Sequence, residues 1–471
     1  MAACYSSGVL TRDDPGAAPD DALVRAIGLG SAILFVIGSV IGTGIFLTTG
    51  GMAVNIPSAS LLLTAWTLGG LFAIAGGLTY AEMGAMFPRS GGVYVFLKEA
   101  YGPLLAFLYG WAALLVVLSG GIAAVAVGFA EYVRYFVPSV SAAHVIATIP
   151  MPVGTPLTIS TAKLVAVGSI VALGTINYVG VRSGNLTNAI FTIAKVAGLA
   201  VIPLMAIAFG RVHPQFTPIV PPDLHRPFAS FGVAMIAVLW TYEAWYFIMY
   251  AAGEIRDPQK NVPRALMCGT LVLTSIYLVV NIAYFYALRI DEMKGVTRIA
   301  ERAASALVGS SGATFVALTV VLSTFGCNAA AILAGSRLLF AMAADRAFLP
   351  AASRVHRRYR TPHLAIVGLT VWSAILALSG TYEQLFTYVM FASILFSVAT
   401  GLALFRLRAK MPDRPRPYRT WGYPIVPVLF VAGASAFVVN TLVERPLQSL
   451  AGMGLLALGL PVYWYWRRTD E

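Results

Sequence analysis

The stretch from Val36 to Phe46 reads VIGSVIGTGIF and lies in the middle of an apolar run that extends from about residue 27 to residue 52. The run is long enough to cross a membrane as a helix. Gly42 and Gly44 flank a threonine among β-branched residues, a poor composition for a helix centre. Gly38 and Gly42 also form a GxxxG pair, which commonly serves close helix packing. We predict a break in this helix, with simple packing as the alternative.

A second interruption lies in the sixth apolar run, where Trp240 to Trp245 reads WTYEAW. It places an acidic residue among aromatic residues at mid-depth. If the first five and the next five helices are inverted repeats, both interruptions fall in the first helix of a repeat. Matching interrupted helices in two halves of a chain indicate a transporter binding site, and they favour binding over packing.

Such a pair of breaks has a definite ligand chemistry. Backbone N–H groups that a break releases cannot stay unpaired in hydrocarbon. A helix that restarts after a break presents N–H donors and the positive end of its dipole to a carboxylate. The carbonyls released on the preceding half-helix accept from an ammonium. Two broken helices side by side therefore suit the two charged ends of an α-amino acid.

The composition agrees with a membrane protein. The chain of 471 residues is 58% hydrophobic and 11% charged, with a mean hydropathy of +0.79, whereas a soluble domain carries about 25% charged residues. It lacks the charge to cover its own surface in water, so it must face lipid. The sequence predicts twelve spans, at about 27–52, 60–86, 103–134, 161–180, 187–210, 230–252, 265–289, 313–343, 363–380, 382–407, 423–441 and 447–465.

The distribution of basic residues predicts the topology. With both termini on one side, that side holds 21 of the 32 lysines and arginines and the other side holds 9. The positive-inside rule then places both termini in the cytoplasm. The net charge of +12 is therefore a topology signal and not a nucleic-acid site. We expect a multi-pass protein of the plasma (inner) membrane, without a signal peptide.

One membrane domain is expected. It covers residues 25–466, with repeat one at about 27–210, repeat two at about 230–407 and two additional helices at about 423–465. Residues 1–24 are expected to be a flexible cytoplasmic segment, and residues 467–471 a cytoplasmic tail.

The main rival is a membrane-embedded enzyme, which needs a nucleophile–base pair or a metal cluster at membrane depth. The three cysteines have no metal or disulfide spacing. No HExxH, GxSxG or P-loop pattern occurs. We expect no enzyme activity, metal or cofactor. A transporter-like amino acid sensor stays a further alternative, without an appended signalling domain to support it. The five histidines fall in loops or at span edges: His144, His213, His225, His356 and His363.

Several motifs resemble one known family. The stretch from Val36 to Phe46 resembles the first-helix signature of the amino acid–polyamine–organocation (APC) superfamily. The residues from Tyr242 to Trp245 and from Ala252 to Ala265 are similar to the sixth helix of its L-amino-acid transporter (LAT) branch. The resemblance runs from about residue 25 to residue 465. Further similar stretches are Asn177 to Val181, Phe191 to Lys195 and Gly335 to Met342.

The resemblance implies an all-α membrane protein with a LeuT-like fold of five plus five inverted helices and two more appended. The substrate carboxylate would meet the backbone N–H groups of Gly42, Thr43 and Gly44, helped by the Thr43 hydroxyl. Trp240 would be an aromatic gate over the substrate, although an aromatic in a span more often serves packing. The implied substrate-binding set is Val40, Ile41, Gly42, Thr43, Gly44, Trp240, Thr241 and Glu243, with the carbonyls of Val40, Trp240 and Glu243 near the substrate ammonium.

Two features depart from the family. Many relatives carry Gly or Asp where this chain has Glu243, whose carboxylate could shape the pocket, act in proton coupling or pair with a basic neighbour. Eukaryotic light chains of the branch use a cysteine between the third and fourth helices to bond an ancillary subunit. Residues 135–160 contain no cysteine, so we expect no disulfide-linked partner, and a monomer or weak homo-oligomer.

Lys195 lies about eight residues into the fifth predicted span. An unpaired lysine at the bilayer centre costs about 2.5–3.5 kcal/mol, and snorkelling to the headgroups would lower that cost. The resemblance implies instead that the ammonium replaces the second sodium ion of the fold. It would bridge first-span carbonyls near Gly38 and Ser39 to the eighth span, where Ser323 and Thr324 are candidates.

Two mechanisms follow from Lys195. If the ammonium stays charged, we expect a sodium-independent exchanger of neutral L-amino acids that works by alternating access. If desolvation lets it release its proton, the protein is a proton-coupled symporter. The expected partners are the amino acid and the lipid bilayer. For Glu82 and Arg337, near cytoplasmic span ends, snorkelling or a salt bridge is expected, and for the basic loop Pro412 to Tyr418, contact with lipid headgroups.

Overall fold

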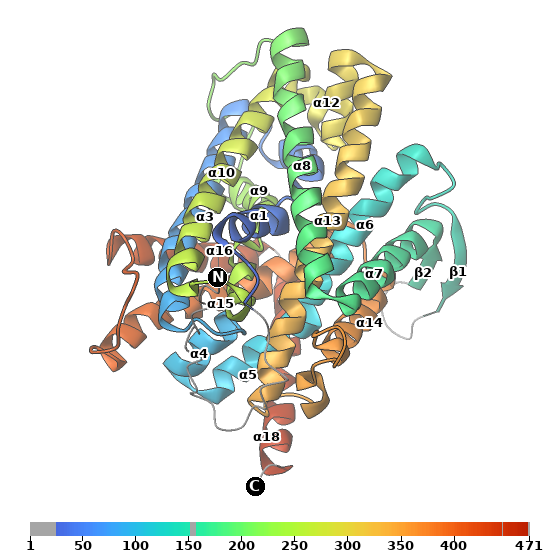
Figure 1. Ribbon diagram of the computed structural model, residues 1–471. Coiled ribbons are helices and arrows are strands. Elements are labelled where there is room, and N and C mark those ends of the chain that lie inside the picture. Colours follow the sequence, from blue (N-terminus) through green and yellow to red (C-terminus); the bar gives the residue numbers. More distant parts are fainter. Residues whose placement is uncertain (1–24, 151–156, 445, 470–471) are drawn as a thin grey trace, which may run out of the picture.

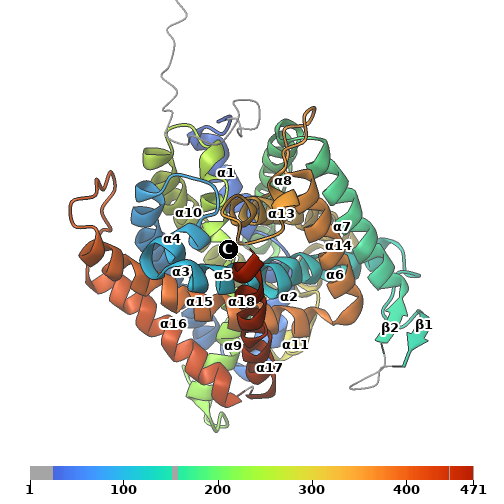
Figure 2. The same cartoon turned by 90° about the horizontal axis from the view of Figure 1, so that it is seen from below.

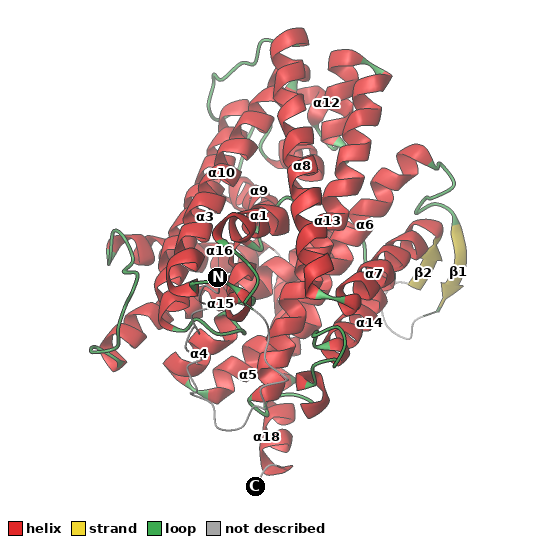
Figure 3. Ribbon diagram, in the orientation of Figure 1, coloured by secondary structure: helices red, strands yellow, loops and turns green. Residues whose placement is uncertain are grey.

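The computed structural model describes residues 25–150, 157–444 and 446–469. This part of the chain is almost entirely helical (Figure 3). The predicted cytoplasmic segment 1–24 lies outside the described residues, as does the end of the predicted tail.

Ten helical runs of the described chain are long and apolar enough to cross a membrane. Two shorter apolar helices, His363–Ser379 (α14) and Gly452–Tyr465, lie where the ninth and twelfth spans are predicted. The chain is therefore a multi-pass helical membrane protein. The ten runs are Leu29–Asn55 (α1, Leu29–Val40, and α2, Gly44–Asn55), Ala59–Met86 (α3), Pro103–Phe136 (α5, Pro103–Ala112, a π-helical turn Ala113–Val117, and α6, Leu118–Phe136), Thr161–Val179 (α7), Phe191–Phe209 (within α8, Val181–Phe209), Pro227–Met249 (α9, Pro227–Tyr242, and a 3₁₀ segment Trp245–Met249), Pro258–Ala287 (α10), Ser310–Ala344 (α13), Tyr382–Lys410 (α15) and Ile425–Glu444 (α16).

The remaining elements are short. The sequence did not predict the antiparallel hairpin of β1 (Val145–Ile149) and β2 (Leu157–Ser160), because strands of four or five residues give little periodic signal. The hairpin projects from the edge of the bundle beside α7 and α14 (Figure 2), so the all-α prediction misses it. The other short helices are α4 (Val93–Tyr101), α11 (Ile290–Met293), α12 (Ile299–Val308), α17 (Pro446–Ala457), α18 (Gly459–Thr469) and the 3₁₀ turns Ala252–Glu254 and Pro350–Ser353.

Both predicted breaks are present. The first run is helical to Val40 and again from Gly44, and α1 packs against α8, α10 and α13 (Figure 1 and Figure 2). The α2 half packs against α9. A Cβ on Gly44 would lie 2.8 Å from the Cα of Thr241, so only glycine lets the start of α2 approach the end of α9 this closely.

The second break is a left-handed turn. Helix α9 ends at Tyr242, and Ala244 has a φ of +73°, a conformation that costs a non-glycine residue free energy. The chain then continues as the 3₁₀ segment Trp245–Met249. The two breaks lie together, because the Ser39 hydroxyl donates to the Ala244 carbonyl at 3.3 Å.

Candidate functional site

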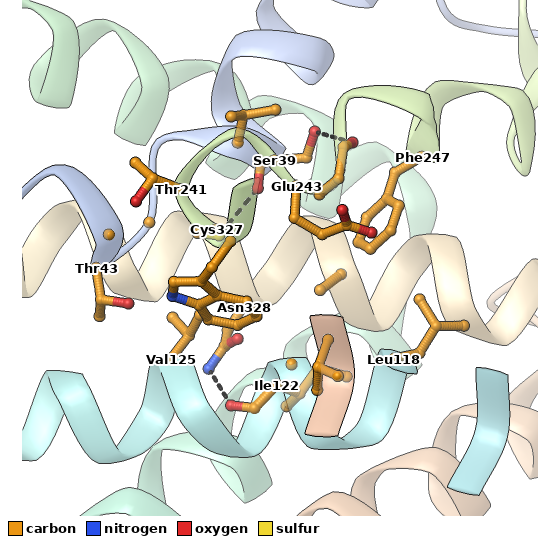
Figure 4. Close-up of a pocket in the computed structure, with 18 of the residues that line it drawn as sticks. Ser39, Thr43, Leu118, Ile122, Val125, Thr241, Glu243, Phe247, Cys327 and Asn328 are labelled. Atoms are coloured by element: carbon orange, nitrogen blue, oxygen red, sulfur yellow. Dashed lines mark hydrogen bonds between the residues drawn. The ribbon is translucent and has the colours of Figure 1, made fainter. Parts of the chain in front are cut away.

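A pocket lies between the two breaks (Figure 4). Its walls come from the α1–α2 junction, the α9 break, α6, α13 and α15. The structure thus brings most of the predicted substrate-binding set to one cavity. Ile41 is not among the lining residues and is fully buried. The predicted residues that line the pocket are Ser39, Val40, Gly42, Thr43, Gly44, Trp240, Thr241 and Glu243.

Lys195, on α8, is fully buried behind the first break. Its ammonium donates to the carbonyls of Gly38 at 2.7 Å, Ile41 at 2.8 Å and Ser323 at 3.2 Å. Helix α1 ends at Val40, so the Gly38 and Ile41 carbonyls have no helical partner. The ammonium is therefore held inside the protein and does not snorkel.

Two predicted members of the Lys195 bridge are corrected. The ammonium meets the Ile41 carbonyl and not that of Ser39, which accepts instead from the Cys327 thiol at 3.0 Å. The Thr324 hydroxyl donates to the Val320 carbonyl of its own helix at 2.9 Å. Threonine commonly makes this bond inside a helix, and the sequence alone does not show which face of α13 meets the break.

Tyr277, on α10, joins the two breaks. Its hydroxyl lies 3.3 Å from the Val40 carbonyl and 3.2 Å from the Thr241 carbonyl. Both carbonyls lie near the end of a broken helix, so both need an outside donor. Tyr277 was not predicted from the sequence, because one tyrosine in an apolar run carries no pattern.

The N-terminal end of α2 is different. Within the described residues, the N–H groups of Gly42, Thr43 and Gly44 have no hydrogen-bond acceptor, and all three residues line the pocket. These groups lie at the positive end of a helix dipole, which is an anion-binding arrangement. The Thr43 hydroxyl shares a hydrogen bond of 3.0 Å with the Tyr382 hydroxyl.

Trp240 packs over the pocket with aromatic residues from α15. Its ring stacks on Phe386, with centroids 5.8 Å apart and an interplanar angle of 21°. Its indole N–H donates to the Tyr382 hydroxyl at 2.9 Å. Tyr382 thus connects Trp240 with Thr43. Tyr382 and Phe386 were not predicted from the sequence, where they are two aromatic residues four apart at the start of the tenth predicted span, a spacing that also serves ordinary helix packing.

Glu243 contributes a carboxylate to the wall. One oxygen, Oε1, accepts from the Tyr246 hydroxyl at 2.6 Å and from the Ser393 hydroxyl at 2.5 Å. No lysine or arginine of the described chain forms an ion pair with Glu243. The predicted alternative of pairing with a basic neighbour is therefore wrong for this part of the chain.

Two further charges inside the spans, Glu82 and Arg337, are paired. Arg337 binds Glu254 at 2.6 Å, and both side chains are 1% exposed. Glu82, fully buried, binds Arg408 at 2.7 Å and lies 3.4 Å from Arg416. Of the two expectations for Glu82 and Arg337, snorkelling or a salt bridge, the structure shows a salt bridge for each. Arg416 of the basic loop lies against Glu82, and contact of the loop with lipid headgroups stays a prediction.

Metal ligands are scattered in the described chain. Among residues 25–150, 157–444 and 446–469, no three His, Cys, Asp or Glu side chains gather where they could hold a metal ion. The polar groups that the pocket does offer are backbone ends, hydroxyls, a thiol, an amide and a carboxylate.

Comparison with known proteins identifies the family. The family model described as amino acid permease matches residues 27–457. The serine/threonine exchanger SteT of Bacillus subtilis is 31% identical, over 94% of this chain and 97% of the relative. The large neutral amino acids transporter small subunit 2 of Homo sapiens is 30% identical, over 96% of this chain and 82% of the relative. The Asc-type amino acid transporter 1 of Mus musculus is 29% identical, over 96% of this chain and 83% of the relative. The chain belongs to the amino acid permease family.

Proposed function

We propose that the protein is a secondary active transporter that exchanges neutral L-amino acids across the membrane by alternating access. The observation that carries this proposal is the pocket between two broken helices, where the N–H groups at the start of α2 are open. The printed names of the relatives, a serine/threonine exchanger and a large neutral amino acid transporter, support the same substrate class.

The zwitterion fits one orientation. Its carboxylate accepts from the N–H groups of Gly42, Thr43 and Gly44, where the dipole of α2 is positive. Its ammonium lies at the carboxyl ends of α1 and α9, beside the carbonyls of Val40 and Trp240. These carbonyls already accept one bond each, from Tyr277 and from the Glu243 N–H, and each keeps a second lone pair. Trp240 is the gate over the bound amino acid.

The proposed architecture is a LeuT-like fold of twelve spans, five plus five in inverted repeats with two appended. The breaks in the first and sixth helical runs support the repeat. The bias of lysine and arginine supports termini in the cytoplasm and a place in the plasma membrane. The protein acts as a monomer or weak homo-oligomer without a disulfide-linked partner, and it is not an enzyme.

Lys195 makes the transporter independent of sodium. Three carbonyls surround its ammonium at 2.7–3.2 Å, as oxygen ligands would surround a cation. A cation built into the chain replaces a bound sodium ion and stays in place through the cycle. We therefore favour exchange over proton symport.

Proteoliposomes separate the two mechanisms. We expect uptake of labelled amino acid from a neutral L-amino acid panel only into vesicles preloaded with unlabelled amino acid, with equal rates in sodium and choline buffers. Strong accumulation in empty vesicles under a pH gradient would show proton symport instead. Absence of uptake under every condition, with absence of any thermal stabilisation of the purified protein by the twenty amino acids, would reject the transport proposal as a whole.

A further inference from the structure

The pocket wall away from α2 has few hydrogen-bond donors left for a ligand. The Ser39 hydroxyl donates to Val36 and Ala244, and the Thr241 hydroxyl donates to Ala237. The Cys327 thiol and the indole N–H of Trp240 are also engaged within the protein. A ligand side chain in this part of the pocket therefore meets no open donor among these four groups.

The same wall has open acceptors. The Asn328 amide nitrogen donates to the Ile122 carbonyl at 3.1 Å (Figure 4), which fixes the orientation of the amide. The amide oxygen, Oδ1, is buried and has no partner within the described residues, and Asn328 is 2% exposed. An unpaired buried acceptor is unfavourable unless an occupant of the pocket donates to it.

Glu243 is the second open acceptor. Both hydroxyls that bind it donate to Oε1, and Oε2 accepts no hydrogen bond from the described part of the chain. Glu243 and Asn328 lie on different elements and line the same pocket. Around them the wall is apolar, with Leu118, Ile122 and Val389.

We propose that Asn328 and Glu243 form a polar subsite that binds the side-chain hydroxyl of a small amino acid, with Asn328 Oδ1 accepting its hydrogen bond. This inference rests on the proposed function, which supplies the amino acid. The Glu243 carboxylate repels acidic side chains and limits the size of the subsite. A side-chain ammonium fits less well, because it brings three donors to a wall with two open side-chain acceptors and apolar neighbours.

Threonine and valine test the subsite, since they have nearly the same shape and differ in one donor. We expect purified full-length protein to bind L-threonine about tenfold or more tightly than L-valine, as a hydrogen bond to a buried acceptor provides. L-Serine should likewise bind more tightly than L-alanine. Calorimetry or thermal-shift titration measures these affinity ratios. L-Ornithine, whose side chain carries an ammonium, is titrated in the same way to test for a cation site.

Variants assign the effect to Asn328. In Asn328→Leu the threonine-to-valine ratio should fall to within about twofold of one while valine still binds; Asn328→Ala serves if the leucine protein does not fold. Ser119→Ala is the matched control, because the Ser119 hydroxyl is also buried without a partner in the described residues but does not line the pocket. Its ratio should equal that of the parent protein.

Each other outcome overturns the inference. Equal binding of threonine and valine by the parent protein would rule out the subsite and leave the proposed transport function intact. Tighter binding of ornithine than of threonine replaces it with a cation site. An unchanged threonine-to-valine affinity ratio in Asn328→Leu would show that Asn328 is not the acceptor. If none of the twenty amino acids binds, the proposed function fails first and the subsite fails with it.

Discussion

The two sides of the first helix break differ in the hydrogen bonds that the rest of the described chain makes to them. On the α1 side, the carbonyls of residues 38–41 each accept from a side chain of another helix. On the α2 side, the N–H groups of residues 42–44 have no acceptor within the described chain and line the pocket. The carbonyl side is thus held by side chains of the protein, with the second lone pair of the Val40 carbonyl left for the proposed ligand ammonium, and the N–H side is left for the ligand carboxylate.

This difference teaches how a broken helix is kept broken. A helix centre in a membrane would reform its internal hydrogen bonds unless other groups took them over. The donors that do so have different strengths: an ammonium from Lys195, a hydroxyl from Tyr277 and a thiol from Cys327. Substitutions at these positions should therefore have graded effects, which the following predictions order from the largest to the smallest.

Lys195→Met should have the largest effect. It removes the common donor of the carbonyls of Gly38, Ile41 and Ser323. The Ile41 carbonyl keeps the Ser323 hydroxyl at 3.0 Å, whereas the Gly38 carbonyl loses its side-chain donor, and a buried unpaired carbonyl costs about 1–3 kcal/mol. We expect exchange of labelled amino acid in proteoliposomes to fall about 100-fold or more, together with a lower thermal midpoint in detergent. Glu254→Gln is the control, since it disturbs another buried charge, the partner of Arg337, outside the pocket. Full exchange by the Lys195→Met protein would show that the ammonium is not needed for transport.

Gly44→Ala tests the N–H side. The added methyl would lie 2.8 Å from the Cα of Thr241, so α2 must move away from α9. Overpacking of this kind costs about 1–3 kcal/mol, and it displaces the donors that receive the carboxylate. We expect amino acid affinity to fall about tenfold or more in thermal-shift titrations. Gly51→Ala is the matched control on the same helix, because a methyl there meets open space, and it should bind as the parent does.

The breaks themselves were predictable from sequence, whereas the groups that hold them open were only partly predictable. Glycine and β-branched residues around Thr43 lower helix propensity locally, so the composition of residues 38–44 predicts the break. Lys195 was visible because a charge in an apolar run needs an explanation. Tyr277, Cys327 and Tyr382 look like ordinary members of their helices, and their roles depend on which face of α10, α13 or α15 meets the breaks. That orientation is set by tertiary packing.

Tyr277→Phe should have an intermediate effect. The change keeps the buried ring and removes the hydroxyl that lies between the Val40 and Thr241 carbonyls. The lost bond is worth about 1–1.5 kcal/mol, so we expect exchange to fall about tenfold with a small change in thermal midpoint. Tyr284→Phe is the matched control, since the Tyr284 hydroxyl donates to the carbonyl of Ile45, the second residue of α2, and not to a carbonyl at the C-terminal end of a broken helix. Equal losses in both variants would show that a tyrosine hydroxyl matters here only for stability.

Cys327→Ser should have the smallest effect. The thiol is a weak donor, and serine keeps a donor on the same carbon, directed to the Ser39 carbonyl that the thiol contacts at 3.0 Å. We expect exchange rates and amino acid affinities within about threefold of the parent in the same vesicle assay. Cys327→Val, of similar size and without a donor, should lose more than the serine variant and less than Tyr277→Phe. If Cys327→Ser abolished exchange as fully as Lys195→Met, donor strength would not determine how the carbonyl side is held, and the contrast between the two sides of the break would need another cause.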